Sequence, residues 1–242
     1  MSGHAGSGGR LGLVVPSSNT TAEVEFDRYT PEAVSIHTAR MALESVSVDE
    51  LDAMSDGAGR AAELLGHAEV DVVAYACTTG SLLHGPGFDA ELEETLSAAA
   101  NAPAVATARS VVRALETLDA HAIAVATPYT ADLDERERDF LAAAGFEVVA
   151  IDGRGIEANV EIGALGPDDA HEQVIELSET VDRVDAVFIS CTNYRSLDAV
   201  AALETELDLP VITSNGATLW DACRVASLPV EGPGTLFERD GE

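Results

Sequence analysis

The chain has 242 residues, of which 46% are hydrophobic and 5% aromatic, enough for an aliphatic core in one large domain or in two domains of about 100 to 120 residues. Its 43 acidic and 13 basic residues give a formal net charge of −30, which excludes nucleic acids and anionic membranes as partners because both are negatively charged. The acidic residues are scattered along the chain, which indicates a solvated, halophilic surface whose repulsion is screened at high salt.

The cysteine content and the termini favour a cytoplasmic protein. The three cysteines form no CxxC pair, which is typical of a reducing compartment. No apolar run approaches the length of about 20 residues that spans a membrane. Residues 1–10 are rich in glycine and serine and lack the apolar segment of a signal peptide, so we expect a flexible leader there.

Short apolar runs alternate with longer segments rich in alanine, leucine and glutamate. Such runs are typical of strands covered on both faces, and the alternation indicates βαβ units with parallel strands. The predicted strands are 11–15, 70–76, 104–106, 122–126, 148–151, 186–189 and 211–212. The predicted helices are 56–68, 88–100, 110–118, 133–144, 167–180, 197–207 and 217–225.

Three segments of the first half recur in the second half in the same order. Val70–Thr79 corresponds to Val184–Asn193, and each segment carries a Cys-Thr pair after its strand. The other matched pairs are Pro16–Thr20 with Thr127–Thr130, and Ala102–Thr107 with Leu209–Ser214. A strand-helix rhythm alone does not explain the recurring polar residues. The repeat therefore predicts an α/β fold of two similar doubly wound parallel-sheet half-domains, related by a pseudo-twofold axis, with an active site in the cleft between them.

The repeat also sets the expected domain boundaries. We expect an N-terminal half over residues 11–108, completed by the C-terminal helix, a C-terminal half over residues 109–228, and a tail over residues 229–242.

The matched polar residues follow the strands, where α/β sheets bind their ligands. The pseudo-twofold axis brings Cys77 and Cys191 to opposite sides of one cleft, where two thiols can transfer protons or act as nucleophile and acid. Each cysteine is expected to precede a helix, whose first N–H groups bind carboxylates and lower the pKa of a thiol. Further donors come from Thr78, Thr79, Thr192 and Asn193, so the site is suited to a small carboxylate.

Several other residues remain open from the sequence alone. The position of Asn19 is compatible with a cap on the next helix or with a ligand contact. The position of Tyr129 is compatible with a structural role in a turn or with a place in the active site. Cys223 lies in a predicted helix and is assigned to packing. The six histidines show no metal-ligand spacing, so no metal site is predicted. His84, the histidine nearest to a cysteine in sequence, is the one candidate for a Cys–His hydrolase.

Three motifs carry a family resemblance that covers roughly residues 10 to 228. Pro16–Glu23, Cys77–Ser81 and Ser190–Asn193 resemble the aspartate/glutamate racemase superfamily, in particular its maleate cis-trans isomerase branch. Arylmalonate decarboxylases and ectoine-utilization EutA-type proteins are close by, and Cys191–Arg195 is similar to the latter. Both cysteines are present here, whereas arylmalonate decarboxylases keep only the second.

The resemblance implies a mechanism and a set of site residues. Cys77 attacks the double bond of maleate, a succinyl-cysteine adduct forms, and rotation followed by elimination gives fumarate. Cys191 acts as proton donor and acceptor, and no cofactor is required. Asn19, Tyr129 and Asn159 hold the substrate carboxylates. The full substrate-binding prediction is Asn19, Ser18, Thr78, Thr79, Tyr129, Asn159, Thr192 and Asn193.

The expected partner is a small dicarboxylate, and a homodimer is expected from the resemblance. Two alternatives to the isomerase stay open. One is a two-cysteine amino-acid racemase or malonate-type decarboxylase of the same superfamily. The other is a non-catalytic protein that binds small carboxylates.

Overall fold

Two four-stranded parallel sheets form the framework of the computed structural model, which describes residues 8–55 and 57–239. The first sheet has the order β2-β1-β3-β4 and contains β1 (Gly9–Pro16), β2 (Val34–Met41), β3 (Val72–Tyr75) and β4 (Ala104–Ala106). The second has the order β6-β5-β7-β8 and contains β5 (Ala122–Thr127), β6 (Glu147–Gly153), β7 (Ala186–Ile189) and β8 (Val211–Thr213). The matching order confirms the predicted α/β fold with two similar halves.

The helices of the first half are α1 (Ala22–Tyr29), α2 (Val48–Ser55), α3 (Ala58–Gly66), α4 (Thr78–Leu82) and α5 (Phe88–Ala100). Those that follow are α6 (Thr107–Thr117), α7 (Ala131–Ala143), α8 (Asn159–Ile162), α9 (Pro167–Ser178), α10 (Val200–Leu207) and α11 (Ser214–Ala226). Two 3-10 helices are η1 (Leu197–Ala199) and η2 (Thr235–Glu238). The sequence predicted neither β2 nor the helices α2 and α8, and it gave no bounds for the helices expected after Asn19 and Cys77, which are α1 and α4.

The ends of the described chain differ in part from the expectation. β1 begins at Gly9, before the predicted strand, and residues 1–7 of the expected leader lie outside the described residues. The expected tail contains η2, whose Leu236 is buried in the core of the second half.

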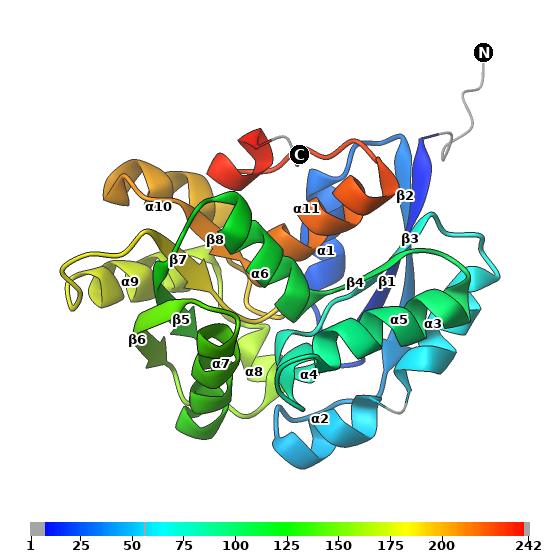
Figure 1. The fold of residues 1–242 in the computed structure, drawn as a ribbon, viewed down its shortest axis with the longest axis horizontal. Coiled ribbons are helices and arrows are strands. Elements are labelled where there is room, and N and C mark those ends of the chain that lie inside the picture. The colour runs from blue at the N-terminus through cyan, green and yellow to red at the C-terminus, as the bar shows by residue number, and fades with distance from the viewer. Residues whose placement is uncertain (1–7, 56, 240–242) are drawn as a thin grey trace.

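Two helices cross between the halves and lie between the sheets in Figure 1. α6 follows β4 of the first sheet, but its Leu115 packs with Ile123 of the second. α11 follows β8 of the second sheet, but its Leu219 and the fully buried Cys223 pack with Leu11 of the first. Each of these two helices therefore packs in the core of the half that it does not follow in sequence.

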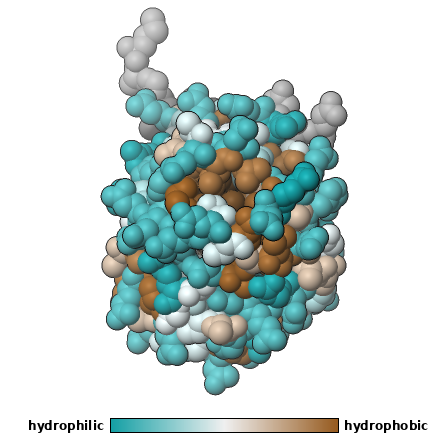
Figure 2. Space-filling view, turned by 90° about the vertical axis from the view of Figure 1, so that its left-hand side faces the viewer, coloured by the Kyte–Doolittle hydropathy of each residue, from teal (hydrophilic) through white to brown (hydrophobic). Residues whose placement is uncertain are grey.

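The outer face of the second half carries an apolar hollow, visible in brown in Figure 2. A cavity of about 450 Å³ there reaches Ala124 and Val187 of the sheet and is bounded by Val174 of α9 and Leu207 of α10. α10 has 8 residues, whereas α5, which occupies the corresponding place in the first half, has 13. The shorter helix leaves part of the second sheet uncovered.

No helix within residues 8–55 and 57–239 combines the length and the apolar composition needed to cross a lipid bilayer.

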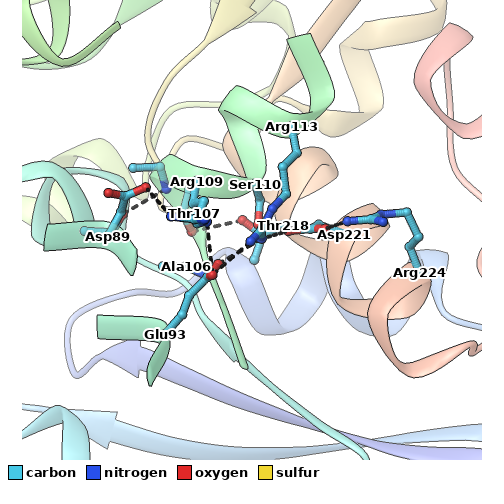
Figure 3. A network of polar contacts seen from close by, with 12 residues as sticks. Asp89, Glu93, Ala106, Thr107, Arg109, Ser110, Arg113, Thr218, Asp221 and Arg224 are labelled. Atoms are coloured by element: carbon cyan, nitrogen blue, oxygen red, sulfur yellow. Dashed lines mark hydrogen bonds and ion pairs between the residues drawn. The ribbon is translucent and has the colours of Figure 1, made fainter. Parts of the chain in front are cut away.

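Charged side chains form a network of hydrogen bonds and ion pairs where α5, α6 and α11 meet, as Figure 3 shows. Asp221 of α11 is fully buried and accepts hydrogen bonds from Ser110 (2.9 Å), Arg113 (2.6 Å) and Arg224 (2.7 Å). Arg113 also binds both carboxylate oxygens of Glu93 on α5, each at 2.9 Å. The two crossing helices are therefore joined by paired, desolvated charges.

The net charge predicts that salt stabilises the fold. Raising NaCl from about 0.1 M to about 1 M shortens the Debye length from about 10 Å to about 3 Å, which weakens the mutual repulsion of the excess carboxylates. We expect the melting temperature, followed by circular dichroism, to rise over this range. An unchanged or lower melting temperature would contradict the interpretation of the surface as halophilic. Sucrose at equal osmolality serves as the uncharged control.

Candidate active site

Cys77 and Cys191 lie just beyond the carboxyl ends of β3 and β7, at corresponding places in the two halves. Their exposed fractions are 5% and 6%. The two thiols are close enough that charge on Cys191 raises the pKa of Cys77. The structure therefore brings the two predicted cysteines together across the junction of the halves.

Cys77 is the residue before α4, as predicted. Burial raises the pKa of its thiol to about 12, while contacts with the Gly80 N–H and the Thr79 hydroxyl lower it. The Thr79 Oγ1 lies 4.0 Å from the Cys77 Sγ. The neighbouring Thr78 Oγ1 lies 2.8 Å from the Ser214 Oγ of α11, which fixes the start of α4 against the crossing helix.

Cys191 has a different backbone, and a loop separates it from the predicted helix 197–207, which the structure contains as η1 and α10. Its φ of 88° lies in the left-handed region, a conformation that costs a non-glycine residue about 1–3 kcal/mol. The chain then makes a turn before η1 begins at Leu197. The Asn193 N–H donates to the Cys191 Sγ at 3.3 Å. Burial raises the pKa of Cys191 to about 11, and the Tyr129 hydroxyl opposes that rise.

Asn19 caps the start of α1, which is one of the two functions that the sequence left open. Its Oδ1 accepts hydrogen bonds from the N–H groups of Thr21 (3.0 Å) and Ala22 (2.9 Å) at the start of α1. Its Nδ2 donates to Thr192 Oγ1 at 3.2 Å, and Thr192 in turn donates to the Ala76 carbonyl at 3.0 Å. One capping residue of the first half thus contacts the second cysteine motif.

Asn193 and Asn159 connect the same two motifs from the other side. The Asn193 Oδ1 accepts the Thr20 N–H at 2.8 Å, and its Nδ2 donates to the Asn159 carbonyl at 2.6 Å. Asn159 donates to Ser18 Oγ at 2.8 Å. Every predicted substrate-binding residue except Ser18 is at most 3% exposed, and all eight lie at the junction between the two halves or beside one of the cysteines.

Two loops close over this junction. Ser45, after β2, forms an isolated antiparallel bridge with Ala158, before α8. The Val46 N–H donates to the Glu157 carbonyl at 2.9 Å. These contacts join the loop after β2 to the loop before α8 across the two halves.

Sequence reasoning missed several residues that support the site. Arg40 of β2 donates to the carbonyls of Ser17 (3.0 Å) and Asn19 (2.9 Å), which fixes the turn after β1. Ser190 binds the buried carboxyl of Glu137 at 2.7 Å. The position of Ser190 directly before Cys191 was the one available signal.

The histidines and the acidic residues do not suggest other chemistry here. His84 pairs with Asp52 at 3.1 Å and packs edge-on against Phe88, which gives it an outward-facing partner instead of a cysteine. Among the residues that the structure describes, no group of three or more His, Cys, Asp or Glu side chains is arranged to hold a metal ion.

Comparisons with known proteins show which proteins the chain is similar to. The sequence profile of the arylmalonate decarboxylase family matches residues 11–237. Maleate isomerase of Pseudomonas putida is 33% identical over 94% of this chain and 96% of its own length.

Two solved structures are also similar over nearly the whole chain. A cysteine-to-alanine mutant of the maleate isomerase of Pseudomonas putida S16, solved with maleate, has a TM-score of 0.90 at 30% identity and covers 94% of this chain and 96% of its own. A cysteine-to-serine mutant of the Nocardia farcinica maleate cis-trans isomerase, with a covalently bound succinylcysteine intermediate, has a TM-score of 0.88 at 30% identity. That match covers 96% of this chain and 99% of its own.

Proposed function

The chain belongs to the arylmalonate decarboxylase family, within the maleate isomerase branch of the aspartate/glutamate racemase superfamily, and we propose that it isomerises maleate to fumarate. The pair of buried thiols across the junction carries this proposal. The mutant relative that holds a succinylcysteine supports it, because such an adduct needs a cysteine nucleophile and a four-carbon dicarboxylate.

The proposed reaction starts with Cys77 as the nucleophile in its thiolate form, after its S–H proton has passed to water. A lone pair of its sulfur forms a bond to one olefinic carbon, and the π electron pair moves to the neighbouring carbon. The Cys191 S–H bond breaks and its proton goes to that carbon, which leaves a thiolate on Cys191. The product is a succinyl adduct whose central C–C bond is single and free to rotate.

Elimination reverses these steps after rotation. The Cys191 thiolate removes a proton from the same carbon, the double bond re-forms in the trans geometry, and the Cys77 sulfur leaves with its electron pair. No net oxidation or reduction occurs, so atoms and electrons balance with these two side chains alone.

The surrounding amides and hydroxyls are proposed to bind the carboxylates. The Asn159 amide donates to the Ser18 hydroxyl, the Asn193 amide donates to the Asn159 carbonyl, and Tyr129 lies beside the Cys191 thiol. When substrate enters, these donors exchange protein acceptors for carboxylate oxygens, which accept several hydrogen bonds. Neutral donors compensate for the few basic residues of the chain.

Proton NMR of the purified protein with maleate at about 1 M NaCl tests the activity. We expect the olefinic signal of maleate to be replaced by that of fumarate. Phenylmalonate and a panel of amino acids in D₂O are the competing substrates. Decarboxylation of phenylmalonate, or deuterium exchange at an amino-acid α-carbon, without maleate turnover would replace the isomerase by the corresponding family activity.

The Cys191→Ser variant tests the assignment of Cys191 as the proton carrier. A serine hydroxyl is a much weaker acid than a thiol, and its alkoxide is inaccessible at neutral pH. Proton transfer should slow, so we expect fumarate formation to fall by at least about 10²-fold. An adduct with the mass of one maleic acid should accumulate on Cys77, because water can protonate the carbon whereas elimination lacks its thiolate base; peptide mass spectrometry detects the adduct. Cys223→Ser, at another buried cysteine, is the matched control. An adduct on Cys223, or an unchanged rate in Cys191→Ser, would contradict the assigned roles.

A further inference from the structure

A buried carboxyl group lies behind the second cysteine. Glu137 of α7 is 1% exposed, and its Oε1 accepts a hydrogen bond from the Ser190 hydroxyl at 2.7 Å. Its Oε2 is buried and has no hydrogen-bond partner within the described part of the chain. Burial raises the pKa of Glu137 to about 8, so the group is mostly neutral at pH 7.

Glu137 belongs to a polar cluster that ends at the Cys191 thiol. Ser190, its hydrogen-bond donor, directly precedes Cys191 in the chain. The side chains of Ser190 and Cys191 both interact with the Tyr129 hydroxyl. Charge on Glu137 raises the pKa of both Tyr129 and Cys191. The carboxyl is therefore coupled to the group that transfers the proton.

The charged side chain that shifts the pKa of Glu137 is itself acidic. Asp134, one turn earlier on α7, raises the pKa of Glu137. Asp134 itself is influenced by Asp152 of β6 and by Arg138. α4, which packs against α7, has no ionisable side chain between Thr78 and Leu82. No basic side chain is among the groups that shift the pKa of Glu137.

We propose that Glu137 is a positioning residue for proton transfer at Cys191, acting through Ser190 in its neutral form and switching the transfer off when it ionises. The inference rests on the proposed function, in which the Cys191 proton moves to the substrate carbon and the electron pair stays on the sulfur. A neutral carboxylic acid tolerates the thiolate that this step creates. A carboxylate at the same place opposes it by repulsion in a poorly hydrated environment.

The pH profile of turnover is the first test. As pH rises through about 8, wild-type Glu137 loses its proton and kcat should decline. Glu137→Gln keeps an oxygen acceptor for Ser190 but cannot ionise. We expect its kcat at pH 7 to stay within about threefold of wild type, with the alkaline decline shifted upward by at least about one pH unit. Superimposable profiles, or loss of activity at every pH in a folded variant, would overturn the proposal.

Glu25→Gln is the matched control in the other half. Glu25 is also a buried acid on the first helix of its half, and burial raises its pKa to about 7. It binds the Leu197 N–H and the Asn215 side chain, away from Tyr129. If Glu25→Gln moves the alkaline decline and Glu137→Gln does not, the assignment to Glu137 is wrong.

A second measurement does not depend on substrate. In a Cys77→Ala, Cys223→Ala background, Cys191 is the sole thiol, and iodoacetamide alkylates it at a rate set by its thiolate fraction. Adding Glu137→Gln should lower the pH midpoint of alkylation by at least about half a unit, because the opposing carboxylate is gone. Circular dichroism checks that each variant is folded.

The two measurements separate the inference from the proposed function. A shifted alkylation midpoint in a protein that leaves maleate unchanged would remove the isomerase assignment while supporting the coupling of Glu137 to Cys191. An unshifted midpoint with normal maleate turnover would overturn the inference alone.

Discussion

Cys77→Ala is expected to lower kcat for maleate by at least about 10³-fold, because the variant has no sulfur to form the adduct. The fold should survive. The Cys77 thiol makes only weak sulfur contacts with the Gly80 N–H and the Thr79 hydroxyl, and alanine removes one buried atom, at a cost of about 1 kcal/mol. Fumarate formation is followed by proton NMR, and the melting temperature is measured on the same sample.

The control for this variant is Cys223→Ala, which removes the sulfur of another buried cysteine from the core of the first half. It should lose some stability and keep its turnover. Combining Cys77→Ala with Cys191→Ser should also prevent the adduct that Cys191→Ser alone accumulates. A Cys77→Ala rate within about threefold of wild type would show that the nucleophile is assigned wrongly.

The sequence was informative where one physical constraint acts on consecutive residues. Strands covered on both faces must be apolar throughout, which is why β3 and β7 were visible as runs before each cysteine. The matched Cys-Thr pairs then placed Cys77 and Cys191 at equivalent sheet positions, and the observed strand order agrees. What the repeat could not give is the left-handed backbone of Cys191, since residues 77 and 191 are identical in type.

Elements at the edges of the sheets were harder to predict. β2 is an edge strand that carries Ser35, His37 and Arg40, so it lacks the continuous apolar signal of a central strand. Arg40 was therefore not predicted to support the site, although its side chain donates to the Asn19 carbonyl in the turn after β1. Glu137 was not predicted to lie near the site either, because a glutamate on an acidic helix is usually exposed. Only the packing of α7 shows that it is buried.

Asp221→Ala should destabilise the fold by about 3 kcal/mol, near the lower end of the loss expected when one partner of a buried ion pair is removed. The variant removes the acceptor of three donors, of which the fully buried Ser110 hydroxyl is out of reach of solvent. The other two donors, Arg113 and Arg224, keep 25% and 35% of their side chains exposed, which lets solvent compensate part of their lost pairing. Urea denaturation followed by circular dichroism measures the loss.

Arg28→Ala is the surface control, because Arg28 is 58% exposed in its pair with Asp198, and its loss should change stability by at most about 1 kcal/mol. Added salt should stabilise wild type and Asp221→Ala alike, so the difference between them should persist, since the largely buried pairs of the wild type are weakly screened. Asp221 also ties α11 to α6, and α11 carries Ser214, the partner of Thr78 beside the first cysteine. A loss below about 1 kcal/mol would mean that apolar packing of the crossing helices, rather than this charge network, holds the two halves of the site together.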